Sequence, residues 1–267
     1  MRNLLCAALV VFLFSCGSGD NSNNNNADAG DAATSSVPVM GFTVVNAYPH
    51  DTAAFTQGLA FYKGKLYEST GNKGFSRLRE VDLTTGKVLR EHRLSDSLFG
   101  EGVVVLNDTV YQLTWQEKKL LRYTVKDFKP LPSFPLSTEG WGITAINNEL
   151  VVTDGSSNLY FYRPYDFQLL RTQGVTEDGA PDANLNELEY INGFIYANQW
   201  QYNYILKIDP SSGQVVGKMD LSALAQRAKA KQPGADVLNG IAYNEETKKT
   251  YVTGKWWPEL YEIQFPF

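Results

Sequence analysis

The fold is decided by a short segment that the chain repeats, first as Gln57-Gly58-Leu59-Ala60-Phe61. The later copies are Glu101-Gly102-Val103-Val104-Val105, Trp141-Gly142-Ile143-Thr144-Ala145, Asn186-Glu187-Leu188-Glu189-Tyr190 and Asn239-Gly240-Ile241-Ala242-Tyr243. Copies that follow one another at about 40 to 50 residues indicate a repeat in which each unit is one supersecondary element. We expect each copy to be the first strand of such a unit.

A tight turn and a second strand follow each copy. The turns of the first four copies are Lys63-Gly64, Asn107-Asp108, Asn147-Asn148 and Asn192-Gly193. Such pairs tolerate the positive φ that two-residue hairpins require. An apolar residue then returns at Tyr67, Tyr111, Val151 and Tyr196. In the fifth copy the turn from Asn244 to Lys249 is longer, and Tyr251 comes correspondingly late.

These repeats predict an all-β fold, a five-bladed β-propeller. More strand-like sequence and polar turns follow each hairpin, and four strands in about 40 to 45 residues are typical of a propeller blade. The one helix that we expect is Ser222–Lys231, before Pro233-Gly234. We expect the N-terminal strand 42–48 to close the ring by joining the C-terminal blade, which contains strand 260–265. A β-sandwich is the alternative, but it does not explain five matching registers.

The first residues predict export and a lipid anchor. Arg2 precedes an unbroken apolar run from Leu4 to Phe14, which is shorter than the roughly 20 residues needed to span a bilayer but suits a secretory signal. The run leads into Leu13-Phe14-Ser15-Cys16, which resembles a bacterial lipobox. We therefore expect lipidation at Cys16 and anchoring to a bacterial membrane, on its periplasmic or cell-surface side. An ordinary signal peptide with an incidental cysteine is the alternative.

Three segments follow from this interpretation. Residues 1–15 are the expected lipoprotein signal peptide, residues 16–39 a flexible tether, and residues 40–267 the propeller. The tether has almost no large apolar residue to bury. Cys6 and Cys16 are the only cysteines, so we expect no disulfide in the mature protein.

Composition limits the partners. The formal net charge of −5 argues against nucleic acid. Tyr (15), Phe (14) and Trp (5) are abundant, which suits sheets and aromatic pockets. We expect a monomer whose contact with the membrane is through the lipid anchor alone.

The repeat also predicts which side chains meet at the axis. The first strand of a blade lies against the axis, so its first residue in each copy belongs to one ring: Gln57, Glu101, Trp141, Asn186 and Asn239. A second ring is expected where the next strand returns: Gly71, Trp115, Gly155, Trp200 and Lys255. Together these residues predict a small polar pocket. Two alternatives stay open, namely that Glu101 and Lys255 form an ion pair between blades, and that Asn186 and Asn239 cap loops.

Seven stretches in this order resemble the plant and bacterial type of glutaminyl cyclase, also called glutamine cyclotransferase. They are Phe55-Thr56-Gln57-Gly58-Leu59, Gly100-Glu101-Gly102, Gln112-Leu113-Thr114-Trp115, Glu139-Gly140-Trp141-Gly142, Asn186-Glu187-Leu188-Glu189-Tyr190, Ala197-Asn198-Gln199-Trp200 and Thr253-Gly254-Lys255. The resemblance implies a five-bladed propeller that converts N-terminal glutamine of peptides or proteins into pyroglutamate and releases ammonia, without a cofactor. It implies site positions at Phe55, Gln57, Glu101, Trp115, Trp141, Asn186, Trp200 and Lys255.

The chemistry suggests a role for each of these positions. Glu101 is the ring carboxylate that can accept the proton of the α-amine and deliver it to ammonia. Lys255 and Gln57 can stabilise negative charge on the γ-oxygen, and Asn186 can orient the substrate. Phe55 and the three tryptophans are expected to form the walls and exclude water.

A metal is not expected in the site. Catalytic zinc usually takes three protein ligands, often histidine, and the chain has only His50 and His92. His50 is expected to form a loop pair with the neighbouring Asp51. A structural calcium ion held by loop oxygens stays an open alternative.

Two rival functions share the predicted fold. A non-catalytic propeller could bind peptides or glycans in the same pocket, but binding alone requires neither a proton carrier nor an oxyanion donor. A lactonase-like propeller would need several axial carboxylates to hold calcium, and the ring supplies one.

Overall fold

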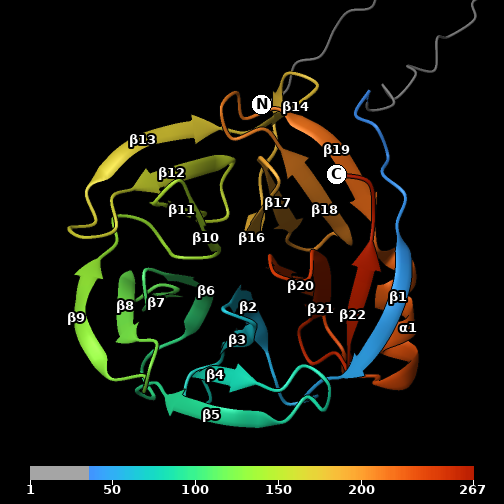
Figure 1. The fold of residues 1–267 in the computed structure, drawn as a ribbon. Helices are drawn as coiled ribbons and strands as arrows, with labels where there is room; N and C mark the ends of the chain where they lie inside the picture. The colour runs from blue at the N-terminus through green and yellow to red at the C-terminus, as the bar shows by residue number, and fades with distance from the viewer. Residues whose placement is uncertain (1–35) are drawn as a thin grey trace, which may run out of the picture. The chain divides into compact units, whose positions relative to one another are not determined.

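Five four-stranded antiparallel sheets surround a central axis in the computed structural model, which describes residues 36–267 (Figure 1). Each sheet is one blade, and the blades follow one another around the ring in chain order. The prediction of an all-β, five-bladed propeller is therefore confirmed. The predicted signal peptide and most of the predicted tether lie outside the described residues.

The first four blades each use four consecutive strands. Blade 1 contains β2 (Thr56–Tyr62), β3 (Lys65–Thr70), β4 (Arg77–Val81) and β5 (Val88–Arg93). Blade 2 contains β6 (Gly100–Leu106), β7 (Thr109–Thr114), β8 (Lys119–Thr124) and β9 (Pro130–Pro135). Blade 3 contains β10 (Ile143–Ile146), β11 (Glu149–Val152), β12 (Asn158–Tyr162) and β13 (Leu169–Gly174). Blade 4 contains β16 (Leu185–Ile191), β17 (Phe194–Gln199), β18 (Tyr204–Ile208) and β19 (Val215–Asp220). A two-stranded sheet, β14 (Thr176–Glu177) with β15 (Ala180–Pro181), lies in the link between blades 3 and 4.

The fifth blade closes the ring by joining the two ends of the described chain. It contains β20 (Leu238–Asn244), β21 (Lys249–Gly254) and β22 (Glu259–Gln264), with β1 (Thr43–Pro49) as its outer strand. β1 is antiparallel to β22, from Thr43 opposite Gln264 to Pro49 opposite Glu259. This is the closure that the sequence predicts. The described end of the predicted tether also contacts the propeller, because Lys218 of β19 donates its N–H to Pro38 O at 3.0 Å.

The inner hairpins turn as their residue pairs predict. Both residues of all four pairs have positive φ, for example 49° at Lys63 and 72° at Gly64. In the fifth hairpin the positive φ is at Lys248, at 58°. Because only this turn chemistry matches the twist of the flanking strands, the pairs keep each blade in register.

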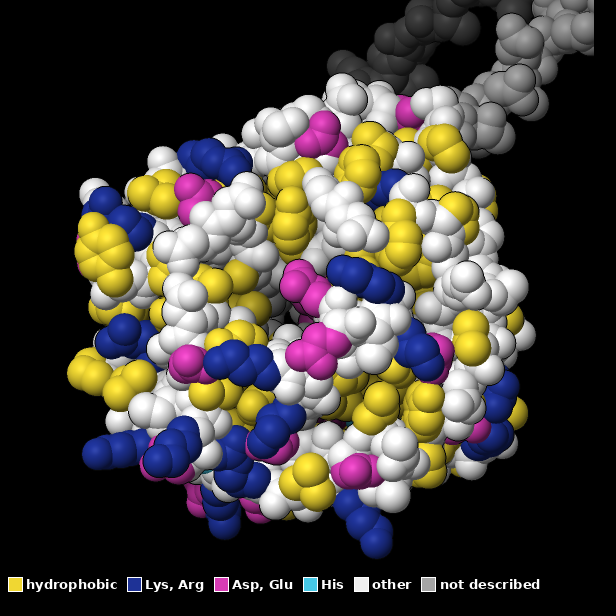
Figure 2. All heavy atoms as spheres, viewed as in Figure 1, with side chains coloured by type: hydrophobic (Ala, Val, Ile, Leu, Met, Phe, Trp, Pro, Cys, Tyr) yellow, Lys and Arg dark blue, Asp and Glu magenta, His cyan; other side chains and the backbone are white. Residues whose placement is uncertain are grey.

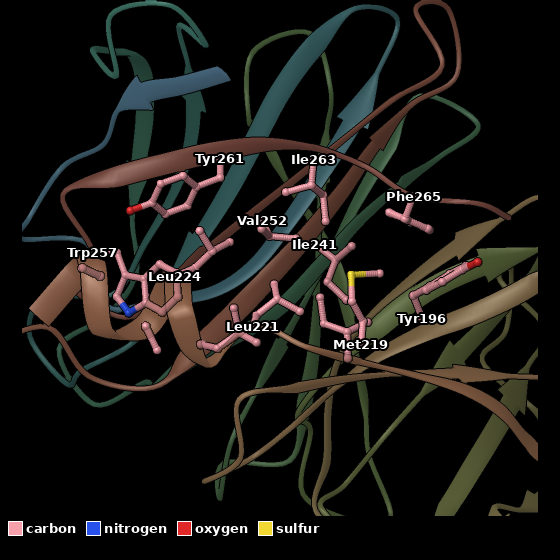
Figure 3. Close-up of a cluster of buried hydrophobic side chains, with 14 of the residues drawn as sticks. Tyr196, Met219, Leu221, Leu224, Ile241, Val252, Trp257, Tyr261, Ile263 and Phe265 are labelled. Atoms are coloured by element: carbon pink, nitrogen blue, oxygen red, sulfur yellow. The ribbon is translucent and has the colours of Figure 1, made fainter. Parts of the chain in front are cut away.

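One helix, α1 (Ser222–Lys231), lies between blades 4 and 5 in the chain and has the bounds predicted from the sequence. Its buried residues are Leu224, Ala225 and Ala228. Figure 3 shows that this face packs on a cluster that also contains Trp257, Tyr261 and Met219. No helix within residues 36–267 is long and apolar enough to cross a membrane.

The hydrophobic core is divided among the blade interfaces. One cluster joins Ala60 and Tyr67 of blade 1 to Val103 and Val110 of blade 2, and similar clusters join the other neighbouring blades. The cluster between blades 4 and 5 is the one that α1 covers. Since each blade buries its faces only against its neighbours, the closed ring is what completes the core.

Glycines let the inner strands approach one another closely. A Cβ atom at Gly102 would come within 2.7 Å of Trp141 O, and one at Gly142 within 1.9 Å of Asn186 O. The second residue of the repeated segment is glycine in four blades. At Gly58, Gly102 and Gly142 a larger residue would meet the next blade's backbone, whereas Gly240 has a φ of 120° and a Cβ there would meet the Leu59 side chain. Figure 2 shows the face viewed in Figure 1 hollowed near its centre, with acidic side chains at the edge of the hollow.

Candidate active site

The starts of the inner strands enclose a cavity of about 280 Å³. Its lining residues are Phe55, Gln57, Phe99, Glu101, Trp115, Trp141, Asn186, Trp200, Asp236 and Lys255. All eight positions that the resemblance implies are among them, and they come from all five blades. Phe99 and Asp236 are additional.

Breaks in strand pairing free the ring residues from the ladder. The register of β2 against β3 shifts between Thr56 and Gly58, which brackets Gln57. Corresponding shifts bracket Glu101 in β6, Asn186 in β16 and Asn239 in β20. A β-bulge re-aims the side chain of its extra residue, and bulges are common beside functional sites. The ring side chains are thus held by strands yet remain free to face the cavity.

Hydrogen bonds fix the second ring beside the first. Trp115 donates its backbone N–H to Phe99 O at 3.1 Å, Trp200 to Asn184 O at 2.8 Å, and Lys255 to Val237 O at 3.0 Å. Each acceptor stands two residues before a residue of the first ring. Lys255 therefore occupies the position predicted from the repeat, in spite of the longer fifth hairpin.

Glu101 is a buried carboxyl group without a protein partner. It is 5% exposed, and no hydrogen bond to a described residue engages its side chain. Burial raises the pKa of Glu101 well above its ordinary value; the positive charge of Lys255 opposes this shift, while Glu139 and Glu117 add to it. The group is thus suited to hold and release a proton.

Lys255 is similarly buried, at 5% exposed, and its Nζ lies over the Phe55 ring, 4.7 Å from the centroid. Burial lowers the pKa of Lys255, against the opposing charges of Glu101 and Asp236. Among the ion pairs of the described residues, none joins Lys255 to Glu101. The alternative of a direct structural ion pair between blades is therefore wrong, and both groups face the cavity uncommitted.

The amides of the first ring differ in how they are held. Asn239 donates its Nδ2 to Thr56 O at 3.0 Å and to Gln57 Oε1 at 3.2 Å, so it ties blade 5 to blade 1 and is not part of the cavity wall. Since Gln57 Oε1 is occupied, its Nε2 is the group left to donate into the cavity. The buried Oδ1 of Asn186 has no hydrogen-bond partner among the described residues. It is available to accept an N–H from a bound molecule.

Aromatic rings form a wall around these polar groups. Phe55 packs edge-on against Phe99 at 6.1 Å, and Phe99 against Trp115 at 5.5 Å. Trp141 packs edge-on against Trp200 at 5.5 Å. Glycines of the second ring make room for them: a Cβ at Gly155 would come within 2.6 Å of the Trp141 ring. The cavity is therefore polar at its centre and apolar on its sides.

Three residues near the cavity are missing from the sequence prediction. Phe99 and Glu139 each stand two residues before a ring residue, as Phe55 does, so the repeat carries a third ring that could have identified them. Asp236 has no such signal, because it lies in the loop before β20 and reaches the cavity wall through backbone pairing with Lys255, Asp236 N to Lys255 O at 2.9 Å.

His50 does not pair with Asp51, so the predicted loop pair is wrong. Its Nε2 lies 2.9 Å from Glu68 Oε1 and its Nδ1 lies 2.8 Å from Trp257 O, whereas Asp51 accepts a hydrogen bond from Arg79. Folding brings Glu68 of β3 against the His50 imidazole, although Asp51 is the residue next to His50 in the sequence. Within residues 36–267, no group of three or more His, Cys, Asp or Glu side chains is arranged to hold a metal ion.

Comparisons with known proteins agree on one family. A family model described as glutamine cyclotransferase matches residues 12–265. A glutaminyl-peptide cyclotransferase from Arabidopsis thaliana is 36% identical over 98% of this chain and 81% of its own length. The crystal structure of Myxococcus xanthus glutaminyl cyclase superimposes with a TM-score of 0.80 and is 39% identical, covering 85% of this chain and 98% of that one.

Proposed function

Because the chain belongs to the glutamine cyclotransferase family and converts N-terminal glutamine of peptides into pyroglutamate, we propose that the cavity at the starts of the inner strands is its active site. The observation that carries this proposal is the pair formed by Glu101 and Lys255. Both are buried at the cavity, and within residues 36–267 neither charged group has a hydrogen-bond or ion-pair partner. Burying charge without a partner is costly, so a bound substrate is the natural partner for both.

Glu101 carries the proton in this mechanism. The neutral α-amine attacks the carbon of its own γ-carboxamide, and a C–N bond forms that closes the five-membered ring. Glu101 accepts the proton that the amine loses and gives it to the departing amide nitrogen as the second C–N bond breaks. The products are the lactam and ammonia, and Glu101 returns to its starting state.

Lys255 and Gln57 stabilise the negative charge on the γ-oxygen of the substrate. Negative charge develops on the γ-oxygen when the amine attacks, and donors aimed at that oxygen stabilise the transition state. Lys255 Nζ and Gln57 Nε2 are two donors of the cavity wall that no described residue engages, and Asn239 orients the Gln57 amide. Asn186 Oδ1 accepts an N–H of the substrate and so orients it.

The aromatic wall holds the substrate and excludes water. The reaction is intramolecular, so confining the amine near the carbonyl supplies much of the rate acceleration. Phe55, Trp115, Trp141 and Trp200 surround the polar groups and would keep water from competing with the amine. In chemical terms the γ-acyl group is transferred from the amide nitrogen, which leaves as ammonia, to the α-amine. This is an aminoacyl-type acyltransferase reaction that proceeds without a cofactor.

The activity has a direct test. Purified protein incubated with a glutamine-leading peptide should release one ammonia per peptide, and the peptide should lose the mass of one ammonia. The same peptide with leading asparagine or with an acetylated α-amine is the control and should not react. Binding of the peptide without ammonia release would contradict the proposed mechanism.

For the cellular location we propose export and lipid anchoring at Cys16. The support is in the sequence: the apolar run ends at Phe14, two residues before Cys16, and no other cysteine follows Cys16. The propeller would then act as a monomer on the periplasmic or cell-surface side of a bacterial membrane. Metabolic labelling with a fatty acid should mark the wild type and not Cys16→Ala; label that persists in Cys16→Ala would disprove the anchor.

A further inference from the structure

Glu139 joins two tryptophans of the active-site wall through one oxygen atom. Its Oε2 accepts the indole N–H of Trp115 at 2.7 Å and that of Trp141 at 3.2 Å. Trp115 follows β7 of blade 2 and Trp141 precedes β10 of blade 3. The carboxylate therefore holds the wall together where two blades meet, and it is not itself a lining residue of the cavity.

We propose that Glu139 is a positioning residue that holds the Trp115 and Trp141 rings in the active-site wall. The inference rests on the proposed function, since it assigns that wall to the substrate. Indole N–H groups in partly buried positions need a hydrogen-bond partner to keep one orientation. The two rings in turn contact Phe99 and Trp200, each at 5.5 Å, so their positions determine much of the cavity shape.

Glu139 has a second effect through its charge. Burial raises the pKa of Glu101, and the negative charges of Glu139 and Glu117 raise it further, whereas the positive charge of Lys255 lowers it. The charge of Asp236 in turn raises the pKa of Lys255. Removing the charge of Glu139 should therefore lower the pKa of Glu101.

Two substitutions separate the hydrogen bonds from the charge. Because both indoles donate to a single oxygen, Glu139→Gln can keep both hydrogen bonds with its one carbonyl oxygen while it loses the charge. Glu139→Asp keeps the charge but is one methylene shorter, so it cannot reach both indoles. Glu117→Gln is the matched control, because Glu117 also acts on Glu101 but bonds Phe99 N and Lys73 instead of an indole.

Steady-state kinetics of the full-length protein with a glutamine-leading peptide test the proposal. Glu139→Asp should raise KM about tenfold, the scale of one lost hydrogen bond to a charged group. Glu139→Gln should keep KM within about threefold of wild type, and the acidic limb of its kcat/KM profile should move to lower pH. Glu117→Gln should move the limb in the same direction and leave KM unchanged.

Indole N–H signals in an NMR spectrum provide a readout that needs no activity. The chain has five tryptophans, and Glu139→Asp should shift two of the five signals, whereas Glu139→Gln and Glu117→Gln should keep both hydrogen-bonded. Should Glu139→Asp not fold, as judged by its melting temperature, Glu139→Ser takes its place. If the aspartate variant keeps all five signals and its KM, or if the glutamine variant loses both as the aspartate variant does, the proposal is overturned. A wild type that forms no pyroglutamate would instead refute the proposed function. The NMR spectra would still show whether Glu139 holds the two indoles.

Discussion

Glu101 differs from most carboxylates in the described part of the chain because no residue there forms a hydrogen bond or an ion pair with it. Glu80, by comparison, accepts hydrogen bonds from Lys65 and Arg90, and its pKa is lowered by these bonds against the effect of burial. Glu101 has the opposite shift because burial dominates. At the residue scale, the site is defined by polar groups that the protein leaves uncompensated.

Substituting Glu101 by glutamine keeps the side chain's size and removes its proton transfer. We expect Glu101→Gln to lower kcat at least about 10²-fold, the usual contribution of a general acid–base group. Because the wild-type pKa is raised, wild-type kcat/KM should fall on acidification at a higher pH than an ordinary glutamate would give, and this limb should be absent from the residual activity of the variant. Ammonia release measured across pH checks both, and near-normal turnover in the variant would remove Glu101 from the mechanism.

Lys255 should contribute mainly to the transition state. Lys255→Met keeps most of the length and apolar contact with Phe55 but removes the positive charge. We expect kcat to fall about 10² to 10³-fold, as the loss of one oxyanion donor does, with a smaller change in KM. Since Lys255 lowers the pKa of Glu101, the acidic limb of the variant should also move to higher pH. A large rise in KM with kcat preserved would assign Lys255 to binding instead.

At the scale of the strands, β16 differs from the other inner strands. It has Glu187 where they have glycine, and this side chain reaches the inner strands of blades 1 and 5. Its Oε1 accepts Leu59 N of β2 at 3.1 Å, and its Oε2 accepts Ile241 N of β20 at 2.8 Å. One buried carboxyl group thereby joins the inner strands of three blades.

The two glutamates of β16 should respond differently to the same substitution. Glu187→Gln replaces one of two acceptor oxygens by an NH₂ group, so a buried backbone N–H loses its partner at a cost of about 1 to 3 kcal/mol. At this size each kcal/mol corresponds to about 2 to 4 °C in Tm. Glu189→Gln is the control, because only its Oε1 is used, by Tyr243 N at 2.7 Å, and burial already raises the pKa of Glu189 to about 8. Equal melting temperatures for the two variants would contradict this account.

At the scale of the whole molecule, a buried network secures the ring where blade 1 meets blade 5. His50, whose side chain is 4% exposed, follows β1 and bonds Glu68 of β3 and Trp257 O near β22. Thr56 and Arg79 also contact Glu68, at 2.8 Å and 3.7 Å. The closure of the ring therefore depends on a titratable pair as well as on the pairing of β1 with β22.

The pH dependence of stability should reveal this closure. Burial by itself lowers the pKa of His50, but the charge and hydrogen bond of Glu68 with the Trp257 carbonyl together raise it above 6.5. The stabilisation is therefore fully present below pH 6.5 and is lost as pH rises through the folded-state pKa. Tm of the wild type should fall over that range, and His50→Gln should remove this part of the decline.

His92 is the built-in control for that measurement. Burial lowers its pKa, so its contribution has the opposite sign and is lost as pH falls below 6.5. His92→Gln should therefore leave the decline above pH 6.5 in place. If His50→Gln and wild type lose Tm in parallel above pH 6.5, the network does not control the closure.

Much of the architecture follows from local signals that repeat. The turn pairs, the axial glycines and the alternating strands each have a physical reason to occur at fixed spacing. Because the chain contains five copies, this spacing can be recognised in the sequence. The pairing of β1 with the last blade followed from the closure that a ring of repeats requires, whereas α1 was predicted from a separate signal, a helical segment that ends before Pro233-Gly234. Most residues that line the cavity could also be predicted, because the repeat assigns seven of them to positions at one end of the inner strands and the family resemblance adds Phe55; Phe99 and Asp236 were not predicted.

What the sequence alone determined is therefore the blade count, the ring closure and the set of side chains that meet at the axis, since all three depend on periodicity. The partners of those side chains, in contrast, depend on how the blades pack against one another. Three contacts show this: Glu139 accepts hydrogen bonds from two indoles, Asp236 pairs with Lys255 through the backbone, and His50 bonds Glu68 instead of Asp51. Each contact depends on how separate elements pack and on which rotamers their side chains adopt. Such contacts depend on distances of a few ångströms, and the pKa values of Glu101 and Lys255 depend on burial, which raises the first and lowers the second. A pattern of residue types contains neither the distances nor the degree of burial.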